Sequence, residues 1–105
     1  MSYVLVWEFT VPAAAAADFE RLYGPTGGWA AFFRADPHYV ATELLRDHAG
    51  LPRYMTIDRW RSRHAYERFR QANLDRYRAL DEEGERLTES ERFLGAFHVV
   101  DGTGA

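Results

Sequence analysis

The chain has 105 residues, a formal net charge of -3 and thirteen basic residues, all of them arginine. Hydrophobic residues make up 47% of the chain and aromatic residues 15%, which excludes a disordered protein. The acidic balance argues against a nucleic-acid partner, and the absence of cysteine excludes disulfides and thiolate metal ligands.

A chain of this length forms one domain, which we expect to cover residues 1–105 with an ordered core over about 3–100 and a frayed tail over 101–105. The opening residues carry no basic leader. No apolar run approaches the roughly twenty residues that a membrane span needs. We therefore expect a cytoplasmic protein with no membrane partner.

The first third of the chain predicts a strand followed by helix. Residues 3–11 are β-branched, aromatic and nearly all apolar, which is typical of a central strand covered on both faces. Pro12 and the alanine run after it predict a helix over residues 12–23, which Gly24 and Pro25 end. Residues 26–35 predict a short helical extension of the same layer.

The middle of the chain predicts a hairpin and a second helix. Residues 38–47 and 54–60 alternate as strands, joined by a connection that contains Gly50 and Pro52. Ser62 is a suitable N-cap for a helix whose apolar stripe runs to Leu80. In the second of these strands one predicted face carries Tyr54, Thr56, Asp58 and Trp60.

After Leu80 the acidic residues around Gly84 predict a solvated connection. Thr88 and Glu91 form a capping-box pattern that predicts a short helical turn, and residues 96–100 predict the last strand. The element order predicts an α+β, ferredoxin-like βαββαβ fold with an antiparallel four-stranded sheet. We expect the first and third strands to be central and to run parallel to each other.

Five segments, WEFTV, YGPTGGW, TELLRD, RYMTIDRW and SRHAYERF, resemble the antibiotic biosynthesis monooxygenase-like family of the dimeric α/β barrel superfamily. The resemblance covers about residues 3–100. It implies a homodimer in which the sheets of two subunits face each other. It also implies a pocket within each subunit, between the sheet and the helices.

The resemblance leaves three activities to consider: a monooxygenase, a non-catalytic ligand-binding protein and a haem-degrading enzyme. The first is a cofactor-independent monooxygenase acting on a small aromatic or polyketide-type substrate. The second is a non-catalytic small-ligand-binding or stress-associated homodimer. Haem-degrading relatives carry Asn, Trp and His where this chain has Trp7, Trp60 and Arg70, so haem binding is disfavoured. No cofactor is expected. A void of a few hundred cubic ångströms near Trp29, Trp60 and Tyr77 would favour the enzyme over a filled core.

Candidate site residues follow from residue type and position. Asp58 is an acid in an apolar strand and costly to bury alone, and Tyr77 lies toward the end of a helical apolar stripe. The pKa of a histidine such as His98 lies near neutrality. A structural role is the alternative for each, and Glu8 could pair with Arg59. The four histidines never approach metal-ligand spacing. The aromatic residues expected to line the substrate pocket are Trp7, Phe9, Tyr23, Trp29, Phe33 and Trp60.

Overall fold

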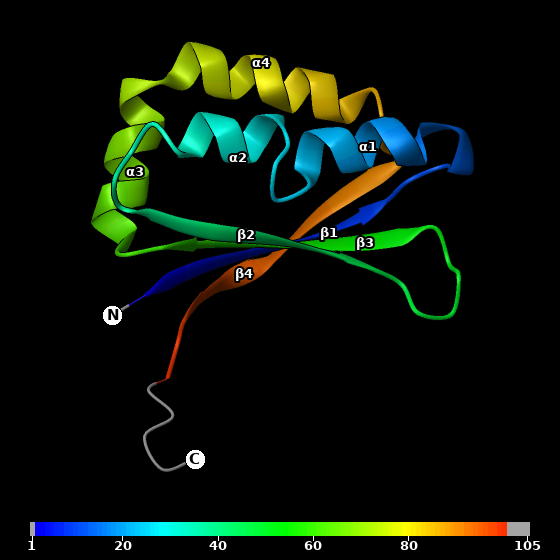
Figure 1. Ribbon diagram of the computed structural model, residues 1–105, viewed down its shortest axis with the longest axis horizontal. Coiled ribbons are helices and arrows are strands. Elements are labelled where there is room, and N and C mark those ends of the chain that lie inside the picture. Colours follow the sequence, from blue (N-terminus) through cyan, green and yellow to red (C-terminus); the bar gives the residue numbers. More distant parts are fainter. Residues whose placement is uncertain (1, 101–105) are drawn as a thin grey trace.

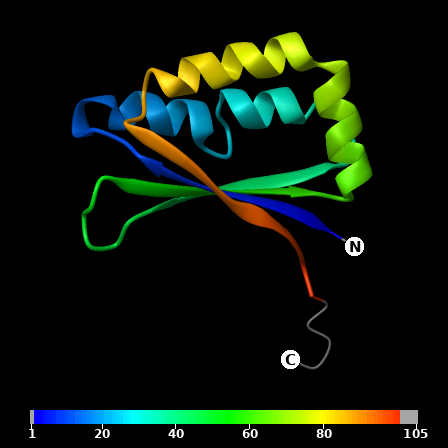
Figure 2. The same ribbon diagram turned by 180° about the vertical axis from the view of Figure 1, so that it is seen from behind.

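An antiparallel sheet with the strand order β2-β3-β1-β4 forms the base of the protein, which a computed structural model describes over residues 2–100. Its strands are β1 (Tyr3–Thr10), β2 (Tyr39–Arg46), β3 (Arg53–Trp60) and β4 (Ser90–His98). The helices are α1 (Ala16–Tyr23, after a 3-10 turn over Ala13–Ala15), α2 (Gly28–Phe33), α3 (Arg63–Ala72) and α4 (Leu74–Glu85). The helices lie on one side of the sheet (Figures 1 and 2). The predicted α+β, ferredoxin-like fold is confirmed.

The two central strands, β1 and β3, run antiparallel, so the prediction that they are parallel is wrong. Tyr3 lies opposite Trp60 and Thr10 opposite Arg53. The crossover through α1 and α2 makes β2 run in the same direction as β1, and the hairpin then turns β3 back. The antiparallel direction of β3 also determines which charged side chains of β1 and β3 lie opposite each other.

The predicted pair between Glu8 and Arg59 does not form, because the antiparallel register places Glu8 opposite Met55. Glu8 instead lies 3.1 Å from Arg92 and 3.9 Å from Arg53, while Arg59 lies 3.6 Å from Glu43. These are exposed pairs, which contribute little to stability.

Two strand predictions need correction. β2 has a register shift between Tyr39 and Ala41, so Tyr39 shares the helix-covered face with Thr42 instead of the face of Ala41. Residues 90–98 form one strand along β1, so the short turn predicted from Thr88 and Glu91 is wrong. Pairing with a whole neighbouring strand outweighs the local capping preference. The expected frayed tail over 101–105 lies outside the described residues.

The second helical segment is longer than predicted and is broken once. Ser62 Oγ accepts a hydrogen bond from Ala65 N (3.1 Å), which confirms the predicted N-cap. The helix breaks at Asn73, whose φ of -130° and ψ of 34° are not helical. α4 then continues through Gly84, where a Cβ would collide with the Tyr23 hydroxyl. Glycine therefore lets the acidic segment pack on α1 as a helix instead of forming the expected connection.

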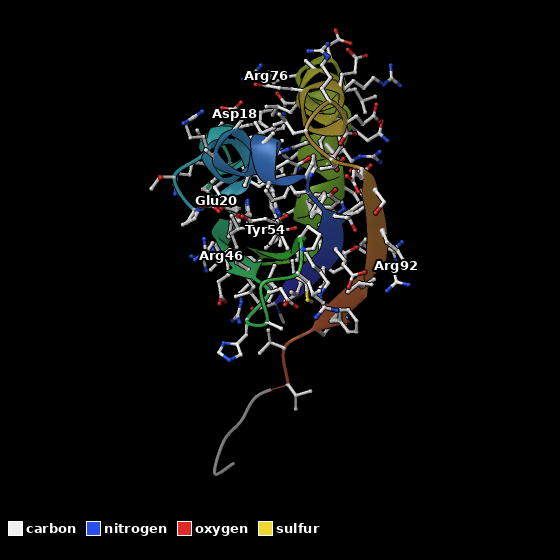
Figure 3. The ribbon with its side chains drawn as sticks, turned by 90° about the vertical axis from the view of Figure 1, so that its right-hand side faces the viewer. Asp18, Glu20, Arg46, Tyr54, Arg76 and Arg92 are labelled. Carbon is white, nitrogen blue, oxygen red and sulfur yellow. The ribbon has the colours of Figure 1, made fainter. Side chains whose placement is uncertain are left out.

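The core lies between the sheet and the helices, and its fully buried large side chains are Trp60, Phe19, Leu80 and Val11. A polar contact ties α1 to β3: the Tyr54 hydroxyl donates to Glu20, and Arg46 lies 3.7 Å from the same carboxylate (Figure 3). Burial and this carboxylate raise the pKa of Tyr54. α1 is thus held in place where it forms one wall of the site below.

Within residues 2–100, no helix is both long and apolar enough to cross a membrane. The opposite face of the sheet carries no helix in this part of the chain (Figure 1). Leu45 and Phe97, on this bare face, are 43% and 51% exposed.

Candidate active site

A cavity lies between the sheet and the helical layer. The volume open to the centre of a water molecule is about 40 Å³. This is room for about three water molecules. This is less than the few hundred cubic ångströms expected for a ligand-sized void. Its lining residues are Leu5, Trp7, Phe9, Tyr23, Trp29, Phe33, Thr56, Asp58, Tyr66, Tyr77, Asp81 and Glu91.

Most of the aromatic residues expected in the pocket do line this cavity. On β1, Trp7 and Phe9 alternate toward the helices, and α1 and α2 supply Tyr23, Trp29 and Phe33. Trp60 is different. It is 0% exposed, and its indole meets Phe33, Tyr39 and Tyr66 edge-on, so the structure places it in the core behind the cavity.

Asp58 on β3 is partly buried and lines the cavity. Thr42 donates a hydrogen bond to Asp58 Oδ1 (2.6 Å), and the Tyr39 hydroxyl lies 2.6 Å from Thr42 Oγ1. Within residues 2–100 Asp58 has no salt-bridge partner. Burial raises its pKa from 3.8 to about 6, against the opposing effect of the Thr42 hydrogen bond. Asp58 can therefore exchange a proton near neutral pH.

Two tyrosine hydroxyls face each other across the helices. Tyr66 Oη of α3 and Tyr77 Oη of α4 are 3.0 Å apart, and both residues line the cavity. Burial raises the pKa of both phenols, so they stay neutral at physiological pH and can donate hydrogen bonds. The Arg70 guanidinium lies 4.8 Å from the centre of the Tyr77 ring.

His98 lies outside the cavity lining and is not brought together with Asp58 and Tyr77. It is exposed, its ring centre is 6.0 Å from that of Tyr3, and its Nδ1 is 3.2 Å from the carbonyl oxygen of Ser2. The contacts of His98 are thus those of a strand-end side chain.

Five lining residues were missed from the sequence: Leu5, Thr56, Tyr66, Asp81 and Glu91. Strand alternation could have found Thr56, which shares a face with Asp58. Asp81 follows Tyr77 by one helical turn and was missed because the helix was expected to end before it. Glu91 was missed because its segment was expected to be a turn. Burial raises the pKa of both Asp81 and Glu91.

Within residues 2–100, no group of three or more histidine, aspartate or glutamate side chains is arranged to hold a metal ion. The polar groups of the residues that line the cavity are carboxyls, hydroxyls and the indole N–H groups of Trp7 and Trp29. These groups can accept and donate protons and hydrogen bonds.

The fold and this aromatic-walled cavity define a ferredoxin-like α+β protein with a candidate site between its sheet and its helices. Residues 2–82 match the antibiotic biosynthesis monooxygenase family, and the chain belongs to that family. The prediction of the family is confirmed.

Solved structures show the same fold. SnoaB, a cofactor-independent oxygenase from Streptomyces nogalater, is 26% identical, with a TM-score of 0.76 over 95% of this chain and 94% of that one. Rv0793 from Mycobacterium tuberculosis is 16% identical, with a TM-score of 0.70 over 96% of this chain and 97% of that one. No curated protein matches the sequence.

Proposed function

We propose that this protein is a cofactor-independent monooxygenase acting on a small phenolic aromatic substrate. Membership of the family and the similarity to SnoaB support this activity. The observation that carries it is Asp58, a carboxyl that lines an aromatic cavity and has no cationic partner in the described part of the chain. We also propose that the protein acts in the cytoplasm.

In this proposal the Asp58 carboxylate removes a proton from a methylene activated by neighbouring phenol rings. The resulting carbanion passes an electron to O₂, and the two radicals combine to a peroxide. Loss of water from the peroxide leaves a ketone, so that R₂CH₂ and O₂ give R₂C=O and H₂O. One hydroxyl of the Tyr66–Tyr77 pair donates to the other, which in turn donates a hydrogen bond to the substrate oxygen atom that carries the negative charge.

A fused aromatic substrate needs more room than the cavity has in this structure. Trp29 and Tyr77 meet edge-to-face with ring centres 5.0 Å apart, and Tyr77 is only partly buried. We propose that substrate enters by rotation of the Tyr77 ring away from Trp29. Binding should therefore change the fluorescence of Trp29.

Oxygen uptake with dihydroxyanthrone tests the activity. This probe is a flat phenolic ketone with an activated methylene. We expect the purified protein, without added metal or cofactor, to consume O₂ in equal amount to the dihydroxyanthraquinone formed, above the spontaneous rate. Release of hydrogen peroxide, or no rate above that of heat-denatured protein, would contradict the proposal.

The small volume of the cavity favours a second candidate, a non-catalytic protein that binds a small ligand. For this candidate we expect dihydroxyanthrone, or a smaller phenol, to bind with a change in tryptophan fluorescence but without oxygen uptake.

We also propose that two copies pair through the bare face of the sheet. Val6, Met55 and Ile57 are partly buried there, beside the exposed Leu45 and Phe97. A second copy would cover this apolar surface, which a chain of this size cannot cover itself.

Phe97→Asp is expected to convert the dimer to a monomer, because it places a charge in the apolar contact while the side chain is half exposed in the single chain. Size-exclusion chromatography with light scattering measures the mass. Leu51→Asp, at the hairpin, replaces an equally exposed apolar residue and should stay dimeric. A wild-type monomer, or equal effects of both variants, would contradict the pairing.

A further inference from the structure

One end of the cavity combines three aromatic rings with two carboxyl groups. Ring centres are 6.3 Å apart for Tyr23 and Trp29 and 5.0 Å apart for Trp29 and Tyr77. Asp81 of α4 and Glu91 of β4 complete this lining. Glu91 is exposed, so this end faces solvent. We call these five residues the acidic aromatic end.

The carboxyl groups of this end are not neutralised by ion pairs. Within residues 2–100 neither Asp81 nor Glu91 has a salt-bridge partner, and Glu85 adds a further negative charge nearby. Arg70 lowers the pKa of Asp81, but by less than burial and Glu85 each raise it. The Arg70 guanidinium lies over the Tyr77 ring. The end therefore attracts positive charge.

A second, independent feature points to a ligand here. Trp29 is 7% exposed and lines the cavity, and its indole Nε1 has no hydrogen-bond partner among residues 2–100. The contact with Trp29 opposes the burial that raises the pKa of the Tyr23 hydroxyl, but Trp29 Nε1 and the Tyr23 hydroxyl do not reach hydrogen-bond geometry. A buried donor without a partner is costly, and an oxygen atom of a ligand would satisfy it.

We propose that the acidic aromatic end binds the protonated amine of an aromatic substrate, while Trp29 Nε1 donates to an oxygen of the same molecule. The faces of tryptophan and tyrosine rings attract cations, and the two carboxylates form charge-assisted hydrogen bonds with an ammonium group. This inference names the ligand class of the same cavity and rests on the proposed function. It predicts that acidic substrates are rejected.

Calorimetric titration with three naphthalene probes of equal ring size tests the inference. We expect naphthylmethylamine, protonated at neutral pH, to bind about tenfold more tightly than uncharged naphthalenemethanol at low ionic strength, and naphthylacetate to bind most weakly. The double variant Asp81→Asn/Glu91→Gln should lose the preference for the amine and keep its affinity for the alcohol. Glu82→Gln/Glu89→Gln removes the same charge from exposed positions and should behave as wild type.

Equal affinities for the amine and the alcohol would overturn this inference alone, because the cavity would still bind an aromatic ring. A wild-type preference retained by the Asp81/Glu91 double variant, or lost equally in the control, would overturn it too. Failure of all three probes to bind would overturn both the inference and the ligand site of the proposed function. Oxygen uptake with dihydroxyanthrone is measured separately and does not depend on the amine.

Discussion

Asp58→Asn is expected to lower the rate of oxygen uptake by about 10²–10⁴-fold, the usual contribution of a general base. The amide has the shape of the carboxylate, and its oxygen can still accept the hydrogen bond that Thr42 donates to Asp58 Oδ1. The variant therefore removes the proton acceptor and little else. An oxygen electrode with dihydroxyanthrone measures the rate, and Glu43→Gln, an exposed acid of β2, is the matched control.

The same variant is expected to be at least as stable as wild type at neutral pH. Because burial raises the pKa of Asp58 from 3.8 to about 6, the folded chain holds a proton that the unfolded chain releases. The free energy of unfolding therefore falls as pH rises through this interval, and the amide removes that loss. Urea denaturation at neutral pH measures it. An active Asp58→Asn would contradict the assigned role, and a variant less stable than wild type at neutral pH would contradict the predicted effect of the raised pKa.

Trp60→Ala is expected to lower the free energy of unfolding by about 3–5 kcal/mol. The indole is 0% exposed and packs among rings of α2, β2 and α3, so its removal leaves a cavity that rigid neighbours cannot fill. Trp60→Phe keeps one ring and should lose less, since the indole Nε1 makes no hydrogen bond to the residues that the structure describes. Urea denaturation followed by circular dichroism measures both.

Trp7→Ala is the matched comparison, because Trp7 lines the cavity and is only partly buried. It should cost less stability than Trp60→Ala. A loss below about 1 kcal/mol for Trp60→Ala would show that Trp60 is not part of the core.

Strand alternation predicted which side chains of β1 and β3 share a face, because successive side chains point to opposite sides of a strand. In the structure the helices cover the face of Asp58 on β3 and the face of Trp7 and Phe9 on β1. Alternation could not tell Trp60 from a cavity residue, since both kinds of residue share one face. Only the packing of α2 and α3 on the end of β3 separates them.

The open end of the cavity was not predictable from local pattern. Asp81 depends on α4 continuing through Gly84, and a glycine in an acidic segment weakens a helix unless a tertiary contact, here with Tyr23, requires it. Glu91 depends on β4 pairing along the whole of β1, which overrides a capping-box sequence. The direction of β3 relative to β1 follows from the topology of the chain. The mistaken parallel direction led to the wrong predicted ion-pair partner for Glu8.

The pH dependence of the oxygen-uptake rate tests most directly whether Asp58 is the base in the cavity. The rate is expected to be low below pH 6 and to rise to a plateau above it, because Asp58 accepts a proton only when ionised, and its pKa is raised to about 6. Thr42→Val should move the inflection to higher pH, since the Thr42 hydrogen bond lowers this pKa. A wild-type profile without an inflection near 6, or one that Thr42→Val leaves in place, would contradict the assignment of Asp58.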